Sequence, residues 1–173
     1  MKTAAICLIL VSLFGCVTQE KKAIDTAVST QLNKKAVTAK STCSSNQVIV
    51  EDGRLAGDSA GVALGIDASM STAPALLSAE LGRVGLVIVK TANADTTVVL
   101  VKRVYLSQTL EAKQVNIVLE VRAPGLPSKI IRTAETSIMW WGSFEESEKA
   151  MAKVFRNTVV QLVGHLNASC RRT

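Results

Sequence analysis

Alternating hydrophobic and polar positions predict a series of β-strands through the middle of the chain. The clearest alternation lies at 113–122, where one face carries Val115, Ile117, Leu119 and Val121. Other apolar segments predict strands at 46–51, 86–91, 96–106 and 129–141, with a shorter one at 62–66. Short turns separate the strands expected between residues 86 and 141. We therefore expect these strands to pair as an antiparallel meander.

Apolar positions spaced three and four residues apart predict two helices. The first lies between Ser71 or Thr72, which would cap it, and the closing glycines Gly82 and Gly85. Glu80 should lie at the edge of its apolar face, which otherwise comprises Ala73, Leu76, Leu77 and Leu81. The second helix begins at a capping box that starts at Ser143, and it runs to about Asn167. Its apolar stripe comprises Met151, Val154, Phe155, Thr158, Leu162, Val163 and Leu166.

The order of these elements predicts the fold class. A strand, a helix, four strands and a final helix indicate an α+β domain of two layers. We expect a mainly antiparallel sheet of four to five strands with both helices on one face. This single domain should span residues 41–173, and we expect it to lie in the periplasm.

The segment at 16–40 precedes that domain and allows two interpretations. Ile24, Val28 and Leu32 recur at every fourth position, which permits a short amphipathic helix. The same segment is rich in lysine, threonine and alanine, and it would serve equally well as a mobile basic tether.

The N-terminus has the three-part layout of a secretory signal peptide. Lys2 precedes an apolar run at 4–15, which is too short to span a bilayer. The run ends in Leu13-Phe14-Gly15-Cys16, which resembles the lipobox of bacterial lipoproteins. That resemblance implies that residues 1–15 are removed and that Cys16 becomes the acylated first residue. Because Val17 stands where aspartate would favour inner-membrane retention, the resemblance implies an outer-membrane anchor facing the periplasm.

The charge distribution argues against a nucleic-acid partner. The chain of 173 residues has a formal net charge of +6, but much of the surplus lies before residue 41. The remainder is nearly balanced, and basic and aromatic side chains do not interleave as they do on nucleic-acid-binding surfaces. The basic segment instead suits an anionic membrane surface.

Cysteine usage fits an oxidising compartment. Cys7 leaves with the signal peptide and Cys16 is acylated, so Cys43 and Cys170 remain. In the periplasm these two cysteines would form one disulfide bond. Free thiols, or pairing between two chains, are the alternatives.

Sequence motifs for catalysis are weak. Ser59 lies in Gly57-Asp58-Ser59-Ala60-Gly61, which matches the nucleophile-elbow pattern. The single histidine, His165, is expected inside the last helix rather than on a loop after a strand, and it has no ligand partner at metal-binding spacing. We therefore expect no enzymatic activity, no metal and no cofactor, and we rank a hydrolase based on Ser59 last.

Two adjacent tryptophans are the candidate interaction residues. Trp140 and Trp141 end the strand expected at 129–141, and strand alternation sends their rings to opposite faces. Trp140 should enter the core, so Trp141 is a candidate contact for a partner protein. Loops or the tether could instead cover both rings.

A wider resemblance supports a role in the envelope. The lipobox, Asp52-Gly53-Arg54, a glycine-rich loop and the leucine-spaced helix resemble the YajG-like outer-membrane lipoproteins. The same layout resembles the two-helix, four-strand domain of the lipopolysaccharide-assembly lipoprotein LptE. The resemblance implies a non-enzymatic accessory component of an envelope assembly, which would use its sheet edge, its loops or Trp141. A lipoprotein that binds lipid or a small molecule between helices and sheet is the alternative.

Overall fold

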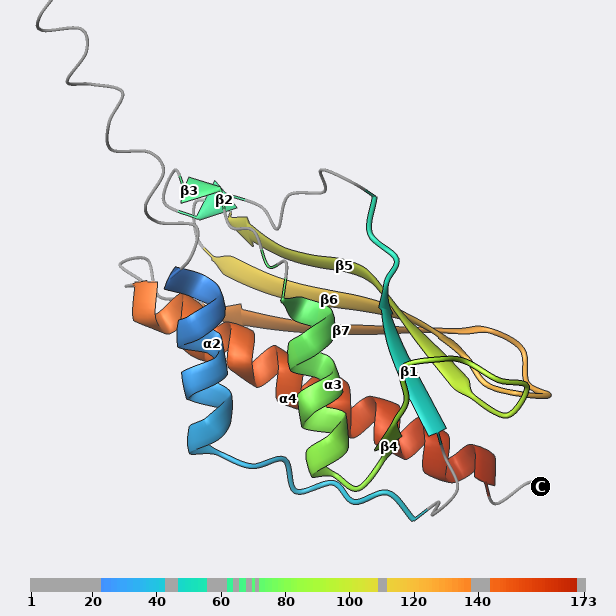
Figure 1. Cartoon of the computed structure of the whole chain (residues 1–173). Coiled ribbons are helices and arrows are strands. Elements are labelled where there is room, and N and C mark those ends of the chain that lie inside the picture. The colour runs from blue at the N-terminus through green and yellow to red at the C-terminus, as the bar shows by residue number, and fades with distance from the viewer. Residues whose placement is uncertain are drawn as a thin grey trace, which may run out of the picture.

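The structure of the chain is a computed structural model, shown in Figure 1. It describes residues 23–42, 47–55, 62–63, 66–67, 70, 72–108, 112–137 and 144–170. The helices are α2 (Ala23–Lys34), α3 (Ala73–Arg83) and α4 (Phe144–Cys170). The strands are β1 (Gln47–Asp52), β2 (Val62–Ala63), β3 (Ile66–Asp67), β4 (Val87–Ile88), β5 (Thr97–Gln108), β6 (Lys113–Arg122) and β7 (Lys129–Ser137).

The main sheet has five strands in the order β4-β1-β5-β6-β7. Strands β5, β6 and β7 form an antiparallel meander in continuous register, apart from a bulge between Val101 and Arg103. The predicted strand at 113–122 has the bounds of β6. The predicted α+β class and the mostly antiparallel sheet are therefore confirmed. Strands β2 and β3 form a separate small antiparallel pair.

Strand β4 departs from the meander expected between residues 86 and 141, because β1 lies between it and β5. Strand β1 pairs in parallel with both of these neighbours. Val48 lies opposite Ile88 of β4 on one side and opposite Thr97 of β5 on the other. Helix α3 supplies the crossover that a parallel β1–β4 pair requires. The predicted strand at 86–91 is reduced to Val87–Ile88, and Val89 N donates one further hydrogen bond to Val48 O at 3.0 Å.

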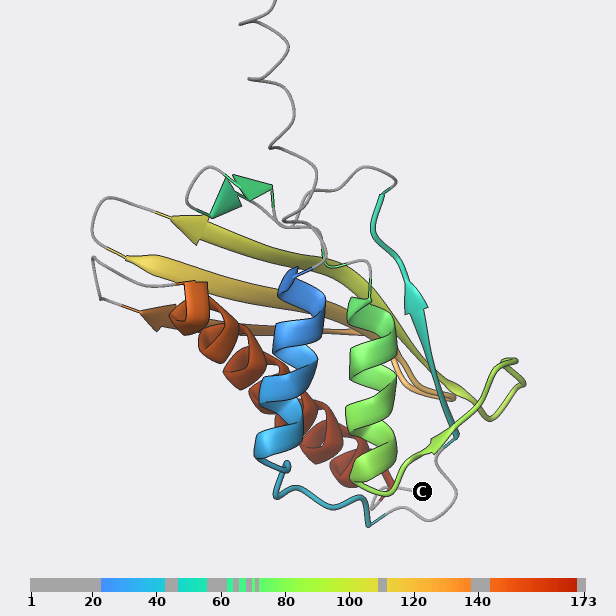
Figure 2. The ribbon, with the colours of Figure 1, turned by 60° about the vertical axis from the view of Figure 1, so that its left-hand side comes forward.

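The described helices lie on one face of the sheet (Figures 1 and 2). Helix α2 is a third helix on that face, so the helical interpretation of 16–40 is the observed one from Ala23 to Lys34. Its Val28 and Leu32 are buried, and the helix packs against α4. After α2 the chain stays in contact with the core through Val37 and Ala39.

Helix α4 provides the largest apolar face of the helical layer. The stripe predicted from Met151 to Leu166 is buried at every position. Phe155 and Leu162 are among the largest fully buried side chains, and each such burial stabilises the fold by about 1.5–3 kcal/mol. Thr158 is buried without penalty because its Oγ1 donates to Val154 O at 2.8 Å. The helical spacing of this stripe therefore places α4 across the sheet.

Helix α3 differs from the prediction in two details. Thr72 occupies the N-cap position, as expected, but its side chain makes no capping hydrogen bond. Glu80 is buried in the core rather than placed at its edge. Its carboxylate accepts a hydrogen bond from Arg83, which in turn donates to Asn33 of α2. Burial raises the pKa of Glu80, and the positive charges of Arg83 and Arg156 oppose that rise.

Candidate functional site

Most residues singled out by the sequence lie outside the described residues. These are Cys16, Cys43, Ser59, Trp140 and Trp141. Lipidation of Cys16, the role of Trp141 and the hydrolase hypothesis based on Ser59 therefore stay predictions. Of the sequence-predicted site residues, His165 and Cys170 are described, and both are half-buried on the last turns of α4.

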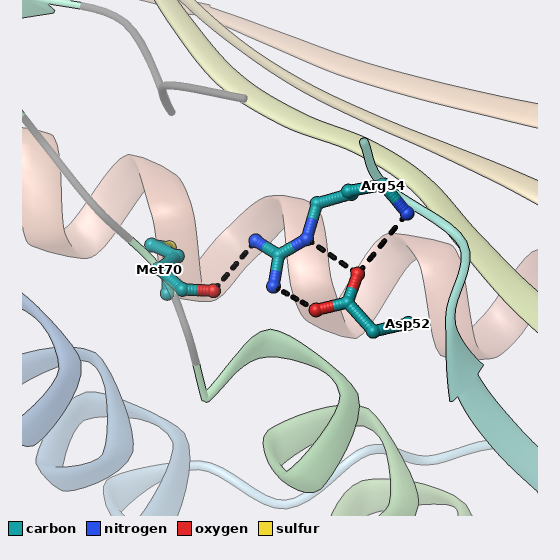
Figure 3. Close-up of polar contacts among 3 residues, drawn as sticks. All are labelled: Asp52, Arg54 and Met70. Carbon is teal, nitrogen blue, oxygen red and sulfur yellow. Dashed lines mark hydrogen bonds and ion pairs between the residues drawn. The ribbon is translucent and has the colours of Figure 1, made fainter. Parts of the chain in front are cut away.

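The element Asp52-Gly53-Arg54 forms an electrostatic clamp after β1 (Figure 3). Arg54 Nε and Nη2 donate to the two carboxylate oxygens of Asp52 at 2.7 and 2.5 Å. Its Nη1 donates to Met70 O at 2.7 Å, which ties the end of β1 to the chain that leads into α3. Gly53, between Asp52 and Arg54, passes close to β5. A side chain there would be crowded, because its Cβ would lie 3.3 Å from the Cβ of Leu100.

The clamp is charged at neutral pH. The hydrogen bond from the Arg54 guanidinium lowers the pKa of the Asp52 carboxyl below its ordinary value. The Arg54 side chain is largely buried, and its planar donors match the carboxylate in two places. The geometry indicates a structural role for this element, since its donors are directed at Asp52 and at the backbone.

The two edges of the sheet differ in length and exposure. Strand β4 contributes two residues to one edge, whereas β7 contributes nine to the other. No described strand pairs with the outer side of β7. Such an edge presents a row of backbone donors and acceptors that can pair with another chain.

A groove of about 800 Å³ runs along the first half of β7 and faces the C-terminal half of α4. Consecutive residues from Ser128 to Arg132 line it. Successive side chains of a strand point to opposite faces, so a wall built from consecutive residues includes the backbone edge itself. The opposite wall comprises Gln161, Gly164, His165, Ala168 and Ser169.

The helix wall of this groove is uncharged and partly apolar. Helix α4 carries no acidic residue, lysine or arginine from Asn157 to Cys170, unlike its first three turns. Gln161, Gly164 and Ala168 are exposed, and the neighbouring Val160 side chain is 44% exposed. A helix surface of this kind is unusual where only water covers it.

The strand wall is positively charged. Lys129 and Arg132 line the groove and are exposed, and neither makes an ion pair with a described residue. Among the described residues that line the groove, none is an aspartate or a glutamate. The second half of β7 differs, because there Glu135 pairs with Lys153 of α4.

A second hollow of about 480 Å³ adjoins the groove through Leu126 and Ser169, which line both. Cys170 lies on its wall. Nearby, Thr42 N donates to Asn167 Oδ1 and Asn167 Nδ2 donates to Lys40 O, both at 3.0 Å. These bonds bring the chain that precedes Cys43 to the last turn of α4. Pairing of Cys43 with Cys170 stays a prediction, and this geometry is compatible with it.

Two further features are limited to the described part of the chain. No group of three or more His, Cys, Asp or Glu side chains there could hold a metal ion. No helix in the same ranges is both long and apolar enough to cross a bilayer.

The sequence identified the sheet edge as a possible interaction surface but missed the residues of the groove. Ile130 belongs to the strand predicted at 129–141, and its side chain is 48% exposed at the edge. The sequence does contain one signal for this surface. The stretch from Asn157 to Cys170 is uncharged and contains more apolar residues than one buried stripe requires.

Comparison with known proteins identifies a solved structure that has a similar fold. No family model matches the sequence, and no curated protein matches it. The structure is similar to the crystal structure of a Xanthomonas campestris protein of the family DUF330, with a TM-score of 0.52 and 15% identity over 80% of this chain and 96% of that one. A minor lipoprotein from Acinetobacter baumannii has a TM-score of 0.38 and 10% identity, over 73% of this chain and 92% of that one. At such identities the first similarity shows a shared fold and nothing about chemistry.

Proposed function

We propose that the protein is a bacterial lipoprotein that serves as a non-enzymatic accessory component of an envelope assembly. Cys16 anchors it to the outer membrane, and its domain faces the periplasm. It binds a partner protein through the groove edge, by which we mean β7 residues 129–133 together with the facing α4 residues 160–169. The observation that carries this proposal is the open edge of β7 beside an uncharged helix surface.

Exposed edge strands are normally protected in monomeric proteins. Shortness, charge or a covering element prevents them from pairing with other chains. Strand β4 follows this rule through its length of two residues. Strand β7 is long. No described strand pairs with the outer side of its first half, which contains the exposed Ile130. A partner that covers this edge in the assembly explains why it is left open.

The position of α2 supports a domain held close to the membrane. Residues 17–22 are the only ones between the proposed anchor and Ala23, where α2 begins. Fully extended, they span at most about 20 Å. The domain therefore works near the bilayer surface, which suits a component of a membrane-associated complex.

The anchor is tested by replacing Cys16. Cells that express the natural chain should incorporate radioactive palmitate into the protein, and the envelope fraction should contain it. The Cys16→Ala variant should show neither. Equal labelling of both chains would contradict the lipid anchor and leave the partner surface untested, so the two parts are measured separately.

The partner surface is tested by photo-crosslinking in intact cells. A photo-reactive benzoylphenylalanine at position 130 should capture one envelope protein reproducibly. The same group at position 79 is the control, because Ala79 is exposed on α3 and lies in neither hollow. Equal capture from both positions, or none from position 130, would overturn the proposal.

Binding of a lipid or a small molecule is the second candidate. The volumes of the groove and the adjoining hollow fall in the range of ligand sites. The groove, however, is walled by exposed backbone and charged side chains rather than by a deep apolar pocket. Mass spectrometry of the purified, lipidated protein distinguishes the two, since a carrier should retain its ligand stoichiometrically.

A further inference from the structure

We propose that the partner contributes an extended acidic segment, which lies in the groove and adds to β7 as a further strand. This inference rests on the proposed function and specifies the chemistry of the partner. Pairing along a sheet edge is a common mode of peptide recognition, in which the main chain supplies affinity and alternate side chains supply selectivity.

The backbone of β7 provides the first requirement. Its inner side pairs with β6 from Lys129 to Ser137. In an antiparallel pair, backbone groups point alternately toward the partner strand and away from it. The outward groups of residues 129–132 therefore face the groove, and together with that of the adjoining Thr133 they can pair with an added strand. Further along, the Glu135–Lys153 ion pair joins β7 to α4, which limits the site to the first half of the strand.

The helix wall leaves room for side chains of the added strand. Gly164 and Ala168 lie one turn apart on α4 and line the groove. A Cβ added at Gly164 would meet no atom within 4 Å. Together with the exposed Val160, these small residues form a shallow apolar surface on which alternate side chains of the segment can rest.

Charge selects the kind of segment. Arg132 shares a strand face with Ile130, whereas Lys129 shares the other face with the buried Ile131. An added strand thus meets a positive charge on each of its two faces. Since none of the described residues that line the groove is acidic, aspartate or glutamate in the partner would supply the missing countercharge.

The test uses the full lipidated chain in detergent micelles and two synthetic peptides. One peptide of about ten residues alternates pairs of threonine with pairs of glutamate, and the other replaces each glutamate by lysine. The glutamate peptide should slow hydrogen exchange of the outward-facing amides among residues 129–133 by at least about tenfold, and the lysine peptide should leave it unchanged. Equal protection by both peptides, or protection confined to other strands, would overturn the inference.

A charge-reversed variant tests the assigned residues. Arg132→Glu should weaken binding of the glutamate peptide by about tenfold or more and improve binding of the lysine peptide. Arg103→Glu is the matched control, because Arg103 is an exposed arginine on β5 that lies outside the groove. Both variants should keep the far-ultraviolet spectrum of the natural chain. Equal losses in the two variants would contradict a specific site.

Other outcomes separate this inference from the proposed function. Crosslinking from position 130 to a partner that presents a helix or a basic segment would preserve the function and overturn the acidic strand. Binding of vesicles containing phosphatidylglycerol, without slower exchange in β7, would show that the positive charges recognise lipid phosphate instead.

Discussion

The two edges of the sheet differ in how far each can pair with a strand of another chain. Val87 on β4 is 49% exposed and Ile130 on β7 is 48% exposed, so each edge presents an apolar side chain to solvent. At β4 the strand is only two residues long and cannot template an additional strand. At β7 the strand is long enough to pair, and a groove lies beside it. Length and surroundings, rather than exposure alone, distinguish the short edge at β4 from the edge that we propose binds a partner.

The largest expected effect concerns the scaffold that holds the β7 edge beside α4. Leu162 is fully buried, and Leu162→Ala should lower the free energy of unfolding by about 2–5 kcal/mol through the cavity it leaves. Its neighbour Gln161 is exposed in the groove, so Gln161→Ala should change stability by less than about 0.5 kcal/mol. Chemical denaturation of the two variants measures the difference. Comparable losses would mean that the helix has no distinct groove side.

The second prediction compares the two edges directly. Ile130→Glu should reduce partner capture or acidic-peptide binding by about tenfold or more, because a carboxylate then faces the acidic segment. Val87→Glu places the same charge at the other edge and should leave binding unchanged. Affinity measurements on both variants, with thermal melts as the folding control, decide the matter. A loss shared by both variants would remove the distinction between the edges.

The third prediction concerns Gly164, which occupies a helix interior and has open space around it. Gly164→Ala should raise the free energy of unfolding by about 1 kcal/mol through helix propensity. Gly164→Phe should instead obstruct the groove and weaken partner binding, while the fold remains intact. Denaturation curves and peptide titrations check the two effects. Destabilisation by alanine would show that the position is packed rather than open.

The smallest effect concerns the clamp at the end of β1, the strand that pairs with β4 through its other end. Asp52 has a lowered pKa, so its contribution to stability is fully present above its unfolded value near 3.8. The contribution is lost as pH falls through the folded pKa. Asp52→Asn should therefore cost at most about 1 kcal/mol at pH 7, since the carboxylate is partly exposed, and almost nothing in strong acid. Urea denaturation of both chains across pH 2–7 should show the difference shrink as the pH falls below about 4 and become smallest at the acid end of the range. A constant difference would contradict the ionic role.

Local patterns predicted the elements whose side chains alternate or repeat regularly. Strand β6 alternates along its whole length, and the buried stripe of α4 repeats at helical spacing, so both followed from the sequence. The parallel pairing of β1 did not, because it depends on how α3 crosses the sheet rather than on any residue of β1. The sequence placed Glu80 at the edge of the apolar face, whereas the structure buries it. The positive charges of Arg83 and Arg156 oppose the effect of burial on its pKa, and these arginines come from two different helices.

The groove shows why the site was harder to predict than the fold. Lys129 and Arg132 are ordinary edge residues in the sequence, and Gly164 and Ala168 are ordinary small residues of a helix. Only the packing of α4 against β7 places them on opposite walls of one groove. The sheet-edge interaction stays a prediction, for which the open edge of β7 is the candidate surface. Trp141 lies outside the described residues and stays a separate candidate.

Hydrogen exchange on the lipidated protein, alone and within its native envelope complex, tests the central claim most directly. We expect the outward-facing amides among residues 129–133 to exchange more slowly by at least about tenfold in the complex, while the amides of β4 are unchanged. Unchanged exchange at 129–133, or protection of β4 in its place, would contradict the claim that β7 is the binding edge.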